Sequence, residues 1–169
     1  MNTRLKIFFF IIILLWNLGI YPGILNTINS NSILAFPFLD KMYSGVCHQQ
    51  DMKLAEVLGF KTLVCSRCAG IYAGVLLASF LLIFIKVKEN IHIKFLLLSA
   101  APLILDVIFY HIGLYNYSKP AAFTSGLFFG CAGFYYFYVG LEKLFSEQKL
   151  KEKLQLSIFL AVQVSSTIK

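Results

Sequence analysis

The sequence predicts an all-α polytopic membrane protein, a four-helix transmembrane bundle with short amphipathic helices in the first extracytoplasmic loop. Of its 169 residues 59% are hydrophobic and only 14% are charged, and the mean hydropathy is +0.76. Soluble domains average roughly 45–50% apolar and 25% charged residues. The apolar residues are also gathered in blocks with basic residues at their ends, a pattern typical of helices that cross a bilayer.

Four of these blocks are long enough to span a membrane. In chain order they cover about 7–25, 69–85, 93–113 and 121–141. At about 1.5 Å per residue, each forms a helix roughly 25–30 Å long. The first block follows Arg4 and Lys6, as in a secretory signal, but no small-residue cleavage site follows it, which favours a retained helix. We therefore interpret residues 1–141 as one membrane domain.

The loop from 26 to 64 is expected to carry two short helices. Apolar residues between Phe38 and Val46 recur at helical spacing, which predicts an amphipathic helix lying on the membrane. A second short helix is predicted between Asp51, a suitable N-cap, and Gly59, a suitable C-terminal glycine.

The basic residues predict the topology. With the N-terminus inside, ten of the 15 lysines and arginines lie on the inner side and five on the outer side. Both termini are then cytoplasmic, and the loop after the first helix is extracytoplasmic. Residues 142–169 form a basic amphipathic cytoplasmic tail, in which 156–164 is too short to span. Because the net charge of +7 suits this topology and anionic headgroups, the expected partner is the lipid bilayer and not nucleic acid.

Two helices carry small residues every four positions. The pairs are Gly70 with Gly74 and Gly126 with Gly130. Such a face lets another helix approach closely, so both pairs are candidate helix–helix contacts.

The chemistry is expected at cysteines near the start of the second span. Cys65 and Cys68 are about one helical turn apart, and Cys47 with His48 precedes them in the loop. Cysteine and histidine ligands in two separated pairs are typical of four-coordinate zinc sites, so all four are candidate ligands of a transition metal, zinc first, with copper or iron also possible. The alternative is one inert disulfide, with His48 simply solvated.

Three other residues are candidates for supporting this site. Asp106 lies inside the third span, where an ionised carboxylate is costly unless it is paired, and Arg67 lies at a similar depth. Asp106 is equally compatible with a structural helix–helix hydrogen bond. Tyr72, one turn after Cys68, either bonds to the site or anchors at the headgroups.

At these motifs the chain resembles an uncharacterised prokaryotic membrane-protein family, the domain of unknown function two thousand and eighty-five. The motifs are Cys47-His48-Gln49, the Cys-x-Arg-Cys-x-Gly-Ile-Tyr-x-Gly run from Cys65 to Gly74, and Pro102 to Asp106. The resemblance covers roughly residues 40–135 and implies a prokaryotic cytoplasmic membrane. It implies no established activity.

Three functions remain open at this stage, and none of them assigns a catalytic residue. The first is metal binding for a structural, sensing or handling role. The second is a membrane thiol-disulfide oxidoreductase that uses Cys65 and Cys68 with Cys47. The third is a non-catalytic scaffold with an inert disulfide. No nucleotide-binding glycine loop or serine-nucleophile elbow is present.

Overall fold

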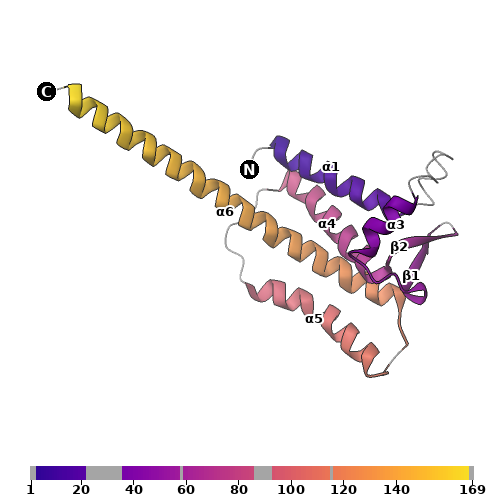
Figure 1. Cartoon of the computed structure of the whole chain (residues 1–169). Coiled ribbons are helices and arrows are strands. Elements are labelled where there is room, and N and C mark those ends of the chain that lie inside the picture. The colour runs from indigo at the N-terminus through magenta and orange to yellow at the C-terminus, as the bar shows by residue number, and fades with distance from the viewer. Residues whose placement is uncertain (1–2, 22–35, 58, 86–92, 115, 168–169) are drawn as a thin grey trace.

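The structure of the protein is a computed structural model that describes residues 3–21, 36–57, 59–85, 93–114 and 116–167. It is mostly helical, as predicted, with a small hairpin near one end (Figure 1). The helices are α1 (Thr3–Gly19), α3 (Phe36–Ser44), α4 (Ser66–Phe84), α5 (Ile93–His111) and α6 (Lys119–Thr167). The strands are β1 (Leu54–Val57) and β2 (Phe60–Cys65), preceded by a single 3₁₀ turn at Asp51–Lys53.

Helix α4 is the centre of the fold. It packs most extensively against α6 and also against α1, while α5 packs mainly on α6. Helix α1 runs antiparallel to α4. Near the start of α1 the Lys6 ammonium donates a hydrogen bond to the Leu82 carbonyl oxygen at the end of α4 (2.8 Å), and near the end of α1 the Trp16 ring contacts the Tyr72 ring in the first half of α4. The lysine thereby caps the C-terminal end of α4, where the carbonyls lack helical partners.

The contact between α4 and α6 is made by glycines. A Cβ atom built at Gly70 or Gly74 would collide with the backbone carbonyls of α6, and one at Gly126 or Gly130 with those of α4. The two predicted small-residue faces therefore meet each other, with the helices running parallel. Backbones this close leave no room for a side chain, which is the geometry that repeated small residues permit.

Two helices in the described part of the chain are long and apolar enough to cross a membrane by length and composition. They are α4 and α5, each with a mean hydropathy of 1.9. In α5 only Asp106 is buried, while Phe95, Leu97 and Leu98 are each more than half exposed. Exposed apolar side chains over a whole helix are what a lipid environment allows and water disfavours.

Several helix ends differ from the predicted ones. Helix α4 begins at Ser66, three residues before the predicted start, because Cys65 takes an extended backbone and serves as the N-cap. Helix α1 ends at Gly19, before the predicted end near 25, and residues 22–25 lie outside the described part of the chain. The predicted fourth helix is the first half of α6, which continues to Thr167 through the predicted tail and past the other helices in Figure 1.

The prediction of a second short helix between Asp51 and Gly59 is wrong. The chain forms a 3₁₀ turn there and then an antiparallel hairpin, in which Leu54 pairs with Cys65 and Val57 with Phe60. Gly59 has a φ of +80°, which suits a tight hairpin turn as well as a helix end. The first short helix is present as α3.

Candidate metal centre

Three cysteines that are far apart in the sequence meet at the start of α4. Cys47 follows the turn after α3, Cys65 ends β2, and Cys68 lies in the first turn of α4. Their three sulfur atoms all lie within 4.8 Å of one another. The three cysteines predicted as ligands of one ion therefore lie together.

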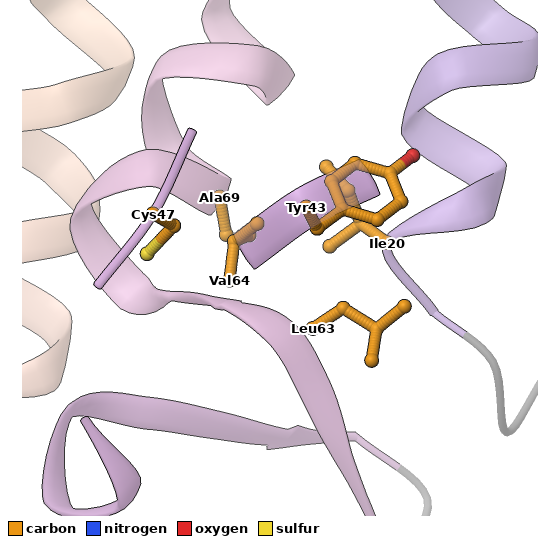
Figure 2. Close-up of a cluster of buried hydrophobic side chains, with 6 residues drawn as sticks. All are labelled: Ile20, Tyr43, Cys47, Leu63, Val64 and Ala69. Atoms are coloured by element: carbon orange, nitrogen blue, oxygen red, sulfur yellow. The ribbon is translucent and has the colours of Figure 1, made fainter. Parts of the chain in front are cut away.

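A small buried core holds the loop in this position (Figure 2). Its apolar members come from the end of α1, from α3, from β2 and from α4: Ile20, Tyr43, Leu63, Val64 and Ala69. The Tyr43 hydroxyl donates a hydrogen bond to the Trp16 carbonyl oxygen (2.5 Å), and the Leu63 amide donates one to the Ile20 carbonyl oxygen (3.1 Å). Helix α3 and strand β2 are therefore both tied to the end of α1.

Gln49, two residues after the first cysteine, has an unusual backbone conformation and ties its segment to the neighbouring elements. Its backbone φ is +43°, a conformation that few residues other than glycine adopt. The side-chain Nε2 of Gln49 donates hydrogen bonds to the Leu63 carbonyl oxygen (2.8 Å) and to the Asp40 carboxylate (3.3 Å). These bonds hold the segment that carries Cys47 against β2 and α3, so Gln49 is a positioning residue for the cysteine group.

The environment of Cys47 favours a thiolate. Hydrogen bonds from the Cys65 and Cys68 thiols hold the pKa of Cys47 well below its ordinary value, against the opposing effect of burial. The Cys65 backbone N–H also donates to the Cys47 sulfur, at 3.2 Å. A thiolate is the form of cysteine that binds metal ions and attacks disulfides.

The three sulfurs fit a single metal ion. Zinc–sulfur bonds are about 2.3 Å long, so sulfurs bound tetrahedrally to one zinc ion lie about 3.8 Å apart. Sulfurs that already lie within 4.8 Å of one another can reach one ion through shifts of about 1 Å or less. Among the described histidine, cysteine, aspartate and glutamate side chains, only these three form such a group.

The structure does not bring His48 into the cysteine group. Its side chain is exposed, whereas that of Cys47 is buried. A fourth ligand would therefore come from water, from an exogenous molecule or from a rearranged His48.

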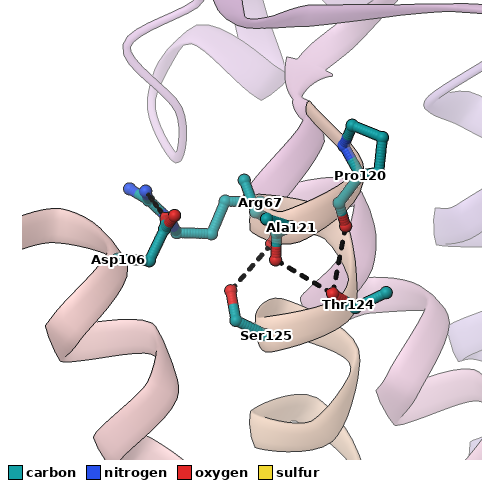
Figure 3. Close-up of polar contacts among 7 residues, drawn as sticks. Arg67, Asp106, Pro120, Ala121, Thr124 and Ser125 are labelled. Carbon is teal, nitrogen blue, oxygen red and sulfur yellow. Dashed lines mark hydrogen bonds and ion pairs between the residues drawn. The ribbon is translucent and has the colours of Figure 1, made fainter. Parts of the chain in front are cut away.

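Arg67 and Asp106 form an ion pair beside the cysteine group (Figure 3). The arginine lies between Cys65 and Cys68 in the first turn of α4, and the carboxylate reaches it from α5. The Asp106 side chain is only 8% exposed and that of Arg67 is 21% exposed. The pair ties α5 to α4 at the end of the bundle that carries the cysteines.

Tyr72 and Cys131 lie in different surroundings. Tyr72 is half-buried and packs against the same core as Cys65 and Cys68. The Cys131 thiol donates a hydrogen bond to the Gly74 carbonyl oxygen (3.2 Å), within the contact between α4 and α6. Cys131 is thus separate from the three-cysteine group.

Replacing Asp106 by asparagine is expected to destabilise the fold by about 3 kcal/mol, because it leaves the partly buried Arg67 without its charged partner. Unfolding by denaturant in a non-ionic detergent measures this difference. The control is Asp51→Asn, in the exposed Lys61–Asp51 pair, for which the expected loss is less than about 1 kcal/mol. Equal losses in both variants would contradict a special role of the Asp106 pair.

Gln49 and Tyr43 also position the site, a role that the sequence motifs did not indicate. Gln49 follows Cys47-His48 directly, but nothing in the sequence indicates its positive φ. Tyr43 lies on the apolar face predicted for α3, and burial of its ring raises the pKa of its hydroxyl to about 12. A tyrosine on a short amphipathic helix could have been suspected of packing beneath the cysteines.

The fold and the site together define a helical protein of membrane type with a three-cysteine group at one end of its bundle. Comparison with known proteins identifies its family. The chain belongs to the family described as "Predicted membrane protein (DUF2085)", whose sequence profile matches residues 47–137. That range begins at Cys47 and contains every residue predicted for the site, so the resemblance found in the sequence is confirmed.

One relative is similar in sequence over part of the chain. The chain is 32% identical over 98 residues to "Uncharacterized protein MJ1492" of Methanocaldococcus jannaschii. The alignment covers 56% of this chain and 63% of the relative, so the chain spans less than two thirds of the relative's length. No solved structure matches the chain.

Proposed function

We propose that this chain is a multi-pass protein of the prokaryotic cytoplasmic membrane that binds one transition-metal ion, zinc first, through Cys47, Cys65 and Cys68. The bound ion serves a structural, sensing or handling role on the extracytoplasmic side. The observation that carries the proposal is the approach of all three sulfurs to within 4.8 Å. Two of them come from one helix mouth and the third from a loop 18 residues earlier in the chain than Cys65.

The donor set supports zinc as the first choice. Thiolates are soft ligands that suit zinc, Cu(I) and iron–sulfur chemistry better than magnesium or calcium. Three protein ligands with a fourth position left open are common where a metal exchanges ligands or is passed on, whereas purely structural zinc sites usually have four protein ligands. His48, next to Cys47, is the nearest side chain in sequence that could fill the fourth position after a local change.

Charged and aromatic neighbours support the group. Arg67, between the two cysteines in the sequence, is held by Asp106 and ties the first turn of α4 to α5. Such outer contacts orient the metal ligands. Tyr72 contributes packing on the side of α1.

The helix directions support a four-span topology. Helix α1 runs antiparallel to α4, and α6 runs parallel to α4. The start of α1 and the C-terminal part of α6 therefore lie toward the same side, opposite the cysteines. With the excess of basic residues on that side, we propose that α1, α4, α5 and the first half of α6 span the membrane with both termini in the cytoplasm.

Metal analysis together with a thiol count tests the proposal. The purified protein in detergent is assayed by inductively coupled plasma mass spectrometry, and its thiols are counted after denaturation in the presence of a chelator. We expect about one metal ion per chain and four reduced thiols. Metal-free protein with two thiols missing, even after growth and purification with added zinc, would overturn the proposal.

A thiol-disulfide oxidoreductase is the second candidate. Three sulfurs within mutual reach can supply both a disulfide and a neighbouring thiolate that attacks it. Equilibration of metal-free protein with glutathione buffers distinguishes the candidates. A disulfide that opens and closes at the potentials of known exchange enzymes favours the oxidoreductase, while a disulfide inert to these buffers favours a scaffold.

A further inference from the structure

A second group of polar side chains lies beside the cysteines, on the side of α5. The Lys53 ammonium lies over the Tyr110 ring, 4.5 Å from its centroid, and 5.7 Å from the centroid of Tyr117. The Arg67 guanidinium lies 6.0 Å from the same Tyr117 centroid. Two cations from different elements thus converge on one aromatic ring.

This group, which we call the Lys53–Arg67–Tyr117 cluster, carries an excess of positive charge. Asp106 pairs with Arg67, but within the described chain no carboxylate forms an ion pair with Lys53. Lys53 is also only half exposed, so water screens its charge incompletely. A single additional negative charge would balance the cluster.

The cluster also holds donors without acceptors. The Nε atom of Arg67 and the hydroxyl of Tyr117 are buried, and neither has a hydrogen-bond partner among the described residues. A buried donor without an acceptor costs about 1–3 kcal/mol. An anion with several oxygens, seated between Lys53 and the guanidinium, would bring acceptors to both donors and the missing negative charge.

The position of the cluster indicates which anion. Arg67 lies at the first turn of the apolar helix α4, Tyr110 at the last turn of the apolar helix α5, and Tyr117 in the connection that follows. The ends of membrane spans lie at the depth of the lipid headgroups, where tyrosine is enriched on both sides of the bilayer. We propose that the Lys53–Arg67–Tyr117 cluster binds a phosphate group, that of an anionic phospholipid or free phosphate, next to the cysteine group.

Each residue has a separate task in this site. Arg67 offers directed N–H donors, while Lys53 offers a point charge held in place by the Tyr110 ring. Tyr117 packs between both cations and donates its hydroxyl hydrogen to a phosphate oxygen. None of the three residues is among the proposed metal ligands. Binding of an anion here can therefore be tested independently of metal binding.

Lipid titration of matched variants tests the proposal. Wild-type protein, Lys53→Gln, Tyr117→Phe and Lys61→Gln are titrated calorimetrically in non-ionic detergent with dihexanoyl-phosphatidylglycerol and, separately, with inorganic phosphate. Lys61→Gln removes the same charge from β2, close in sequence to Lys53, but Lys61 is exposed and paired with Asp51. Thermal unfolding of each variant confirms that it is folded.

We expect Lys53→Gln and Tyr117→Phe each to weaken binding about tenfold or more, which is the effect of losing a hydrogen bond to a charged group. Lys61→Gln should bind like the wild type. Binding of phosphatidylglycerol without binding of inorganic phosphate identifies a lipid headgroup as the source, and comparable binding of both identifies free phosphate. If wild-type protein binds neither, or if Lys61→Gln is as weak as Lys53→Gln, the proposal is overturned.

Discussion

Replacement of Cys65 by serine is expected to lower the affinity for zinc by on the order of a hundredfold or more. Loss of residues that merely support a metal ligand typically costs 10–100-fold, and loss of a ligand should cost more. Cys65 is the cysteine whose backbone N–H also donates to the Cys47 sulfur, and the serine keeps that backbone contact. The change therefore isolates the sulfur as a ligand.

Competition with a chromophoric zinc chelator measures this loss, and the same assay ranks Cys47→Ser and Cys68→Ser. Cys131→Ser is the matched control. Cys131 is a half-buried cysteine that donates a hydrogen bond to the Gly74 carbonyl oxygen and lies outside the three-cysteine group. His48→Ala is expected to retain most of the affinity because the His48 side chain lies outside the cysteine group. A loss on His48→Ala as large as that on Cys65→Ser would show that the imidazole is the fourth ligand.

Replacement of Gly70 by leucine is expected to separate α4 from α6 and to destabilise the protein by more than about 3 kcal/mol. The new Cβ would overlap the Phe123 carbonyl oxygen, a backbone atom that cannot rotate away. Overpacking relieved by side-chain movement costs about 1–3 kcal/mol, and here whole helices must move apart. The cysteine group should suffer as well, because Cys68 is only two residues away on α4.

Gly133→Leu and Gly140→Leu are the controls for this prediction. Both positions lie in α6, and a Cβ there meets no atom within 4 Å. Leucine also favours a helix over glycine by up to about 1 kcal/mol, so these variants should be as stable as the wild type or more so. Thermal unfolding in detergent, followed by circular dichroism, compares the three. A Gly70→Leu protein as stable as Gly133→Leu would contradict the close packing of α4 on α6.

Local sequence signals predicted the helices well but failed at the hairpin. Helices α4 and α5 follow from long apolar blocks bounded by polar residues, and α3 follows from its spacing of apolar residues. At 51–59 an N-cap residue and a glycine suggested a helix, yet the same glycine turns a hairpin. Strand pairing depends on a partner segment, Phe60–Cys65, whose contribution a local reading of 51–59 omits.

The candidate site was predictable only in part. The spacing of Cys65 and Cys68 indicated a shared centre, and their approach to Cys47 is confirmed. The exposure of His48 was not foreseen, because the packing of this segment depends on contacts of the Gln49 side chain with Asp40 and Leu63, which lie elsewhere in the sequence. Nor did the sequence indicate the Lys53–Arg67–Tyr117 cluster, whose members come from three separate segments.

The sequence by itself determined the membrane character of this protein and the two cysteines at the mouth of α4, because hydropathy and spacing along one helix are local properties. Tertiary structure decided that Gly70 and Gly74 pack on Gly126 and Gly130 and that Cys47 joins the pair on α4. These are contacts between distant segments. They depend on the packing of α1, α3 and β2 around one small core, which no single stretch of the chain encodes.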